Sequence, residues 1–296
     1  MLSRSSWLHL RIPFSYFLLP IFLFSVGVSP NLNQSRLLWV FLILHFLLFP
    51  ASNGFNSYYD KDEKSIGGLK NPPPVKIGLL YLALLFDLLA IVLGGIKVNW
   101  TFGIMLLVYG LASKAYSHPS IRLKKYPYSG WIITGFFQGV FTVLMAYVGI
   151  NDFEIQTALM SKVLFAGLLS SLMIWANYPM TQIYQHDEDA KRGDQTLSLR
   201  LGVMGTFYFT AVFFGLATLG FIYFFVEWFD LKYAFSFLIA LSPVAIFFSY
   251  WFLRARANSS KADYQHAMWL NFISATALNA FFIWFFLDSS HVINTF

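Results

Sequence analysis

Nine apolar runs, each close to the length of a membrane-spanning helix, divide this chain. A helix needs about 20 apolar residues to cross roughly 30 Å of hydrocarbon. Short connections join the runs, and within a bilayer only helices or closed barrels satisfy every backbone hydrogen bond. The sequence therefore predicts an all-α, polytopic membrane bundle of about nine transmembrane helices, built as one integral-membrane domain over residues 1–296. The runs lie at 12–29, 37–55, 77–96, 99–114, 131–150, 157–177, 204–226, 233–253 and 267–287.

Lysine and arginine are distributed unequally between the two sets of connecting loops. Sixteen of the 20 fall on the side that carries the N-terminus, and the other side keeps only Arg36, Lys97, Lys162 and Lys232. Because positive loops stay in the cytoplasm, the N-terminus is predicted to be cytoplasmic and the C-terminus extracytoplasmic, in a cell membrane such as a bacterial inner membrane. The net charge of +6 is then an orientation signal, and it requires no nucleic-acid partner.

The chain contains no cysteine. This excludes disulfides, thiolate metal sites and a cysteine nucleophile. The first apolar run follows basic residues without an obvious small-residue cleavage site, so it is expected to be an uncleaved helix. Any metal would have to be held by oxygen or imidazole ligands.

An acidic cluster follows the second apolar run. Asn53, Asn56 and Asp60 are spaced i, i+3, i+7, which places two amides and a carboxylate on one stripe of a helix. Glu63 extends this stripe if the helix continues, and Asp62 lies off it. The stripe is expected to point into the bundle at the cytoplasmic end of its helix.

A second acidic cluster follows the sixth run and repeats the spacing. Gln182, Gln185 and Asp189 are again i, i+3, i+7, with His186 beside them as a weaker functional candidate. Magnesium takes carboxylate and amide oxygens together with substrate phosphates, and it commonly keeps several waters. Two such stripes facing each other would suit a diphosphate bridged by Mg²⁺.

A basic segment, KAYSHPSIRLKKYP, follows the fourth run on the same predicted side. Arginine and lysine complement phosphate oxygens, arginine in a bidentate manner. A polyprenyl or other lipid diphosphate would place its tail among the apolar helices and its head between these acids and bases. The abundant aromatic residues could shield a carbocation there. The basic residues of the segment are Lys114, Arg122, Lys124 and Lys125.

Three motifs in this order resemble the UbiA-type intramembrane prenyltransferases, and the resemblance covers essentially the whole chain. Asn56 and Asp60 match the first two positions of that family's N-x-x-x-D-x-x-x-D segment. YSHPSIRLKK at 116–125 is similar to its Y-S-x-P-P-x-R-L-K segment. The third match is similar to its D-x-x-x-G-x-x-T-L segment followed by R-L-G, and runs through Asp189, Gly193, Thr196, Leu197, Arg200, Leu201 and Gly202.

The resemblance implies an enzyme that transfers a prenyl group from a polyprenyl diphosphate to a small, usually aromatic or lipophilic acceptor within the membrane, with Mg²⁺ as cofactor. The expected catalytic residues are Asn56, Asp60 and Asp189. The expected substrate-binding residues are Lys64, Arg122, Lys124, Gln185 and Arg200. The expected metal ligands are Asp60, Asp62, Glu63, Asp187 and Asp189.

Two departures from the family pattern leave alternatives open. Lys64 stands where the first motif ends in Asp, and Gln185 stands where the second begins with Asp. In a continuous helix Glu63 lies about 60° around the axis from Asp60, whereas Asp187 lies about 160° from Gln185 and could help only if the helix has ended. Alternatively, Lys64 could contact the diphosphate and Gln185 could ligate through its amide oxygen.

Other functions also fit part of the pattern. The departures could signal a superfamily member that transfers another group, such as phosphoribosyl, to a lipid acceptor. A membrane transporter would favour charged residues near mid-span and internal repeats. Only Asp87 fits that description, and it is expected to be neutral and hydrogen-bonded inside the bundle.

Overall fold

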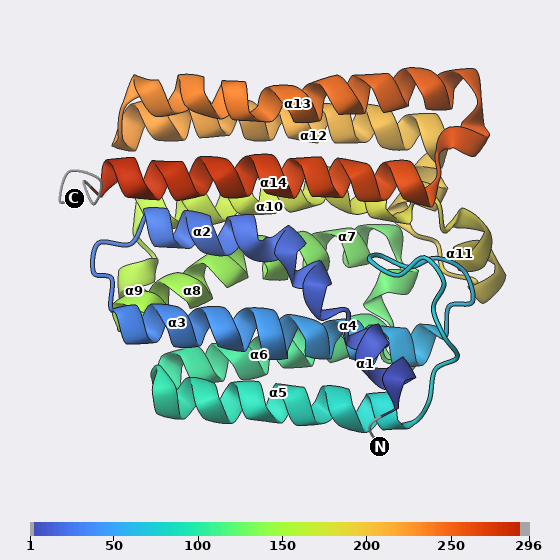
Figure 1. The fold of residues 1–296 in the computed structure, drawn as a ribbon, viewed down its shortest axis with the longest axis horizontal. Coiled ribbons are helices and arrows are strands. Elements are labelled where there is room, and N and C mark those ends of the chain that lie inside the picture. Colours follow the sequence, from blue (N-terminus) through green and yellow to red (C-terminus); the bar gives the residue numbers. More distant parts are fainter. Residues whose placement is uncertain (1–2, 291–296) are drawn as a thin grey trace.

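The computed structural model describes residues 3–290, and every regular element within that range is helical. The long helices run side by side across a slab, as Figure 1 shows. The first half of the chain contributes α1 (Arg4–Leu10), η1 (Ile12–Leu18), α2 (Leu19–Gly27), α3 (Gln34–Leu42), η2 (Ile43–Leu48), α4 (Phe49–Asp60), α5 (Gly78–Lys97), α6 (Trp100–Ser117), η3 (Leu123–Lys125), α7 (Pro127–Gly135), η4 (Phe136–Phe141) and α8 (Thr142–Asn151). The second half contributes α9 (Ile155–Ala158), α10 (Ser161–Gln182), α11 (His186–Arg192), α12 (Leu197–Trp228), α13 (Leu231–Ala257), η5 (Ser259–Lys261) and α14 (Tyr264–Ser289).

Eight helical segments in the described range are long and apolar enough to cross a membrane. They coincide with eight of the nine predicted runs. The remaining run, 99–114, forms α6. This helix has 18 residues and lies beside α5 (Figure 1), but Lys114, Tyr116 and Ser117 make its last turn more polar. The prediction of an all-α, multi-pass membrane bundle is confirmed.

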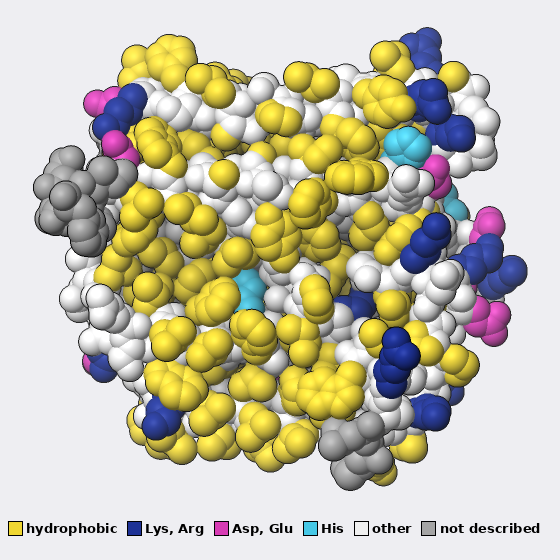
Figure 2. All heavy atoms as spheres, viewed as in Figure 1, with side chains coloured by type: hydrophobic (Ala, Val, Ile, Leu, Met, Phe, Trp, Pro, Cys, Tyr) yellow, Lys and Arg dark blue, Asp and Glu magenta, His cyan; other side chains and the backbone are white. Residues whose placement is uncertain are grey.

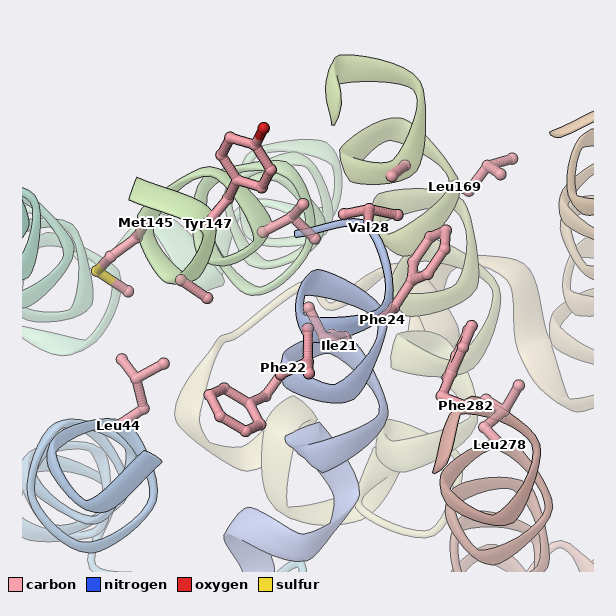
Figure 3. Packing of buried hydrophobic residues seen from close by; sticks show 14 of the residues in the cluster. Ile21, Phe22, Phe24, Val28, Leu44, Met145, Tyr147, Leu169, Leu278 and Phe282 are labelled. Carbon is pink, nitrogen blue, oxygen red and sulfur yellow. The ribbon is translucent and has the colours of Figure 1, made fainter. Parts of the chain in front are cut away.

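Aromatic side chains fill the centre of the bundle around α2. Phe24 of α2 stacks on Phe282 of α14 with ring centroids 4.7 Å apart, and it also contacts Phe224 of α12 at 5.2 Å. Figure 3 shows Phe24 and Phe282 facing each other beside Ile21 and Leu278. The outer helices instead expose apolar residues, as expected of lipid-facing surfaces: Ile239 and Ile246 of α13 are 72% and 70% exposed.

A close approach of α7–η4 to α10 shapes the interior. A Cβ atom built at Gly139 would lie 2.4 Å from the backbone of Ser171, so only glycine fits there. The Ser171 hydroxyl donates to the carbonyl of Gly135 at 2.7 Å, and the Val140 amide donates back to that hydroxyl at 2.9 Å. Small residues spaced i, i+4 allow such approaches between membrane helices. This contact holds η4, which lines the cavity described below.

The polar loops lie together at one end of the slab. Figure 2 shows most of the visible lysine and arginine side chains gathered on the right, with hydrophobic side chains covering the middle. α14 ends at the opposite side of the slab (Figure 1). The loops that follow α4, α6 and α10 therefore meet at one end, as the charge pattern predicts.

Asp87 corrects one expectation from the sequence. It is buried in α5, where it was expected to be neutral, but it forms an ion pair with Lys114 of α6. The Lys114 ammonium also lies 5.1 Å from the centre of the Phe55 ring. Lys114 therefore compensates a buried carboxylate between helices and does not line the cavity.

Candidate active site

A cavity of about 280 Å³ opens among the polar loops and extends between α4, α6, α7 and α10. Its outer part is lined by charged and amide side chains, and its inner part is lined by aromatic and aliphatic ones. The outer residues include Asn56, Asp60, Asp62, Lys124, Gln185, Asp189, Arg192 and Asp194. The inner residues include Leu18, Phe49, Tyr109, Ile133, Phe137 and Ile174, while Phe14 and Phe17 lie near Gly68 of the loop after α4.

The first acidic stripe forms as predicted only as far as Asp60. α4 ends at that residue because Lys61 adopts a left-handed conformation with φ of 51°. The chain then turns, so that the Asp62 side chain is 5% exposed and lines the cavity, whereas Glu63 is exposed and does not. The expectation that Glu63 extends the helical stripe and Asp62 lies off it is therefore wrong.

The second stripe is broken by a turn between two helices. α10 ends at Gln182 and α11 begins at His186. Gln182, Gln185 and Asp189 still line the same cavity. Asp187 points away from it: its side chain is 82% exposed and its carboxylate lies 3.4 Å from the Lys64 ammonium.

Lysine and arginine reach the acids from the loop after α6. The Lys124 ammonium donates to Asn56 Oδ1 at 3.0 Å and pairs with Asp60. Arg122, held in a left-handed conformation with φ of 46°, donates from Nη2 to Asp60 Oδ1 at 3.4 Å. The predicted residues Asn56, Asp60, Arg122 and Lys124 are thus brought together, with Asp189 across the cavity.

Two site residues were not singled out from the sequence. Arg192, at the end of α11, pairs with Asp62 and donates to Asp189 Oδ1 at 2.7 Å. Asp194 receives hydrogen bonds from Arg122. The only sequence signal was their place inside the second acidic cluster, next to Gly193, whose φ of 73° ends the helix and turns the chain back toward the cavity.

Burial and charge shift the pKa values of these acids in opposite directions. Burial raises the pKa of Asp189 to about 6, against the opposing charge of Arg192. Burial, assisted by the nearby Asp60, also raises the pKa of Asp62. Burial alone would raise the pKa of Asp194, but hydrogen bonds from Arg122 hold it below the ordinary value. Asp189 therefore changes its charge nearer to neutral pH than an ordinary aspartate does.

Lys64, Arg122 and Arg200, all predicted to bind substrate, do not line the cavity, although Arg122 contacts the lining residues Asp60 and Asp194. Lys64 is exposed. Arg200 is exposed too, and its guanidinium lies 5.3 Å from the centre of the Tyr128 ring. His186 is held by the Ser198 hydroxyl, with Nε2 and Oγ 2.8 Å apart, and burial lowers its pKa.

Tyrosines and amides separate the polar from the apolar part of the cavity. The hydroxyls of Tyr116 and Tyr178 are 2.5 Å apart, and the Lys124 ammonium lies 5.9 Å from the Tyr116 ring centre. Deeper, Asn177 donates to Asn271 of α14 at 2.7 Å. Aromatic faces of this kind can stabilise a cation.

The arrangement of helices matches a known family. The model of the UbiA prenyltransferase family matches residues 16–273. The chain belongs to the UbiA prenyltransferase family. Among curated protein sequences, none matches the chain.

Solved structures share the fold at low sequence identity. A UbiA homologue from Archaeoglobus fulgidus bound to GPP and Mg²⁺ is 16% identical, with a TM-score of 0.65 and coverage of 95% of this chain and 99% of that chain. The same homologue bound to DMAPP and Mg²⁺ gives a TM-score of 0.66 at 16% identity with the same coverage. Digeranylgeranylglyceryl phosphate synthase is 20% identical, with a TM-score of 0.58 and coverage of 94% and 96%.

Proposed function

We propose that this UbiA-family protein transfers a prenyl group from a prenyl diphosphate to a small lipophilic or aromatic acceptor. The observation that carries the proposal is the cavity itself, which joins a charged mouth to an apolar interior. Phe49 and Asp60 both line it, and 11 residues of α4 correspond to roughly 16 Å of helix. A diphosphate at Asp60 would thus extend its hydrocarbon tail toward Phe49. Family members with GPP or DMAPP and Mg²⁺ support this class of donor.

Magnesium fits the donor atoms at the mouth. Asp60 and Asp62 would hold it from the first acidic segment, with Asp189 facing them from the second. Within the described residues, no three acidic or histidine side chains are clustered tightly enough to form an all-protein metal cage. Magnesium does not require one, since it commonly uses one or two carboxylates together with substrate phosphates. When bound, the ion would neutralise charge on the departing diphosphate.

The residues of the chain have separate roles in this account. Arg122 and Lys124 would bind the diphosphate oxygens, and Asn56 would orient Lys124 through the 3.0 Å hydrogen bond. The bond between the prenyl carbon and the diphosphate oxygen breaks, and its electron pair leaves with the diphosphate. Tyr116 and Tyr178, which line the cavity, would shield the allylic cation. The acceptor then attacks the cation and loses a proton.

Diphosphate release tests this function without knowledge of the natural acceptor. Purified protein in lipid nanodiscs would receive a prenyl diphosphate and a panel of quinol-type and phosphoglycerol-type acceptors. Release is expected only with Mg²⁺, and it should be lost in Asp60→Asn. Arg254→Gln, at an exposed position on α13, is the matched control for folding and surface charge. Magnesium-independent release, or release by Asp60→Asn at the parental rate, would contradict the proposal.

We infer from the loop charges that this mouth faces the cytoplasm. A reporter fused after the last residue should then read as extracytoplasmic. A cytoplasmic reading would reverse the assignment.

A further inference from the structure

Arg192 forms a bridge between the two acidic segments of the site. Its Nη1 pairs with Asp62, in the loop after α4, and its Nη2 donates to Asp189 Oδ1 in α11 at 2.7 Å. Its Nε lies 3.5 Å from Asp194 Oδ2. One planar guanidinium thus contacts three carboxylates, a geometry that its fork of donors permits and a lysine ammonium does not.

The carboxylates that Arg192 contacts are well enclosed. The side chains of Asp62, Asp189 and Asp194 are 5%, 6% and 2% exposed, and Arg192 itself is 22% exposed. Buried charges are stable only when they are paired. The guanidinium therefore supplies the positive charge that this part of the site requires.

Few carboxylate oxygens remain for a metal ion. Asp189 uses both of its oxygens, because Oδ2 accepts from the Thr196 hydroxyl at 3.2 Å. Asp194 uses both as well, since its two oxygens accept from Nε and Nη2 of Arg122. Among the described residues that line the cavity, the carboxylate oxygens with no hydrogen bond or ion pair are Oδ2 of Asp60 and Oδ2 of Asp62, and the amide oxygen of Gln182 is also unpartnered. Both aspartates line the cavity and belong to the same segment.

We propose that Arg192 replaces a metal ion between the two acidic segments, so that the site binds a single divalent cation through Asp60 and Asp62. This proposal rests on the proposed function, because it concerns the metal that accompanies the diphosphate. The sequence suggested that a metal would link the two stripes, but the guanidinium occupies that position. Asp189 and Asp194 then act as positioning residues that hold Arg192.

The number of bound ions distinguishes this arrangement from a metal bridge. Purified protein in nanodiscs would be titrated with Mn²⁺ in the presence of a prenyl thiolodiphosphate, a donor analogue that resists cleavage. Electron paramagnetic resonance counts free Mn²⁺ and so gives the number bound. We expect one ion per chain in the parent, two in Arg192→Gln, whose freed Asp189 can ligate, and one in Arg192→Lys, which keeps the charge. Arg254→Gln, at an exposed position outside the cavity lining, should bind one.

Two bound ions in the parent would overturn the proposal, as would a folded Arg192→Gln variant that binds one. If Arg192→Gln does not fold, the counts in the parent and in Arg192→Lys decide. Binding of no Mn²⁺ with the analogue would contradict the proposed function itself, so the two failures are distinguishable.

Discussion

Arg122 donates hydrogen bonds to both carboxylate oxygens of Asp194, from Nε at 2.9 Å and from Nη2 at 2.8 Å. This fork joins the loop after α6 to the loop after α11, two segments separated by 72 residues. Arginine has five donor hydrogens, so those on Nη1 of Arg122 remain for further acceptors beside Asp60, which does line the cavity. Asp194 thus fixes the orientation of a residue that we propose binds substrate.

Removing Asp194 should therefore affect both stability and donor binding. Truncating one partner of a buried ion pair costs about 3–5 kcal/mol because the other charge is left uncompensated. We expect Asp194→Ala to lower the unfolding temperature and to weaken binding of a prenyl diphosphate by at least roughly tenfold, about 1.4 kcal/mol. Arg36→Gln is the control, since it breaks a half-exposed pair with Asp152 worth at most about 1 kcal/mol. Equal effects of both changes would contradict the role of the fork.

The residues after α4 give a second prediction. Asp62 lines the cavity, whereas Glu63 and Lys64 are exposed. We expect Asp62→Asn to reduce Mg²⁺-dependent donor binding strongly, and Glu63→Gln and Lys64→Ala to leave it within a factor of two of the parent. Calorimetric titration of each variant measures this. Loss of binding in Glu63→Gln, with Asp62→Asn unaffected, would restore the continuous-helix arrangement that the sequence suggested.

The pattern of apolar runs predicted the bundle well because membrane helices are specified by length and hydropathy alone. The end of α4 could not be predicted in this way. It depends on Lys61 in a left-handed conformation, which exchanges the inward positions of Asp62 and Glu63. The break between α10 and α11 could not be predicted either, and it leaves the side chain of Asp187 exposed, outside the cavity.

The partners of charged residues were also beyond a helix-by-helix analysis. Arg192 pairs with Asp62, which lies 130 residues away in the sequence. Arg122 donates hydrogen bonds to Asp194 only because the loops that carry the two residues lie together in the fold. Such pairs are set by how helix ends come together, and periodicity within one helix contains no information about that. Asn56 and Asp60 lie at the cavity as their helical spacing predicted, because α4 continues through both, whereas Asp189 reaches it across the turn between α10 and α11.

The pKa of Asp189 gives a third prediction. Its value of about 6 is raised above 3.8 by burial, so its contribution to stability is present below pH 3.8 and is lost as pH rises through 6. Ionised Asp189 holds Arg192 in the arrangement that we propose for the loaded site, so the stabilisation by Mg²⁺ and donor should be full above pH 7 and should diminish at pH 5. The shift in unfolding temperature on adding both ligands measures this. In Asp189→Asn the shift should depend less on pH, and the same pH dependence in both proteins would assign it to another group.

The pair of Asp87 and Lys114 gives a fourth prediction. Asp87→Asn leaves a buried ammonium without its partner, so unfolding should become easier by about 3–5 kcal/mol. The double change Asp87→Leu with Lys114→Met should recover most of the loss, because apolar pairs often replace buried ion pairs without penalty. Donor affinity should change little in the folded variants, since neither residue lines the cavity. A large loss of donor affinity in a stable double variant would place the pair in the site.

Binding of a prenyl diphosphate to the purified protein, with and without Mg²⁺, tests the central claim most directly. The parent in nanodiscs should bind a prenyl thiolodiphosphate with Mg²⁺ and lose at least roughly tenfold in affinity, about 1.4 kcal/mol, when the metal is chelated. Asp60→Asn should show the weaker affinity under both conditions, and Arg254→Gln should match the parent. Affinity that is unchanged by chelation, or retained in Asp60→Asn, would contradict the assignment of this cavity as a magnesium-diphosphate site.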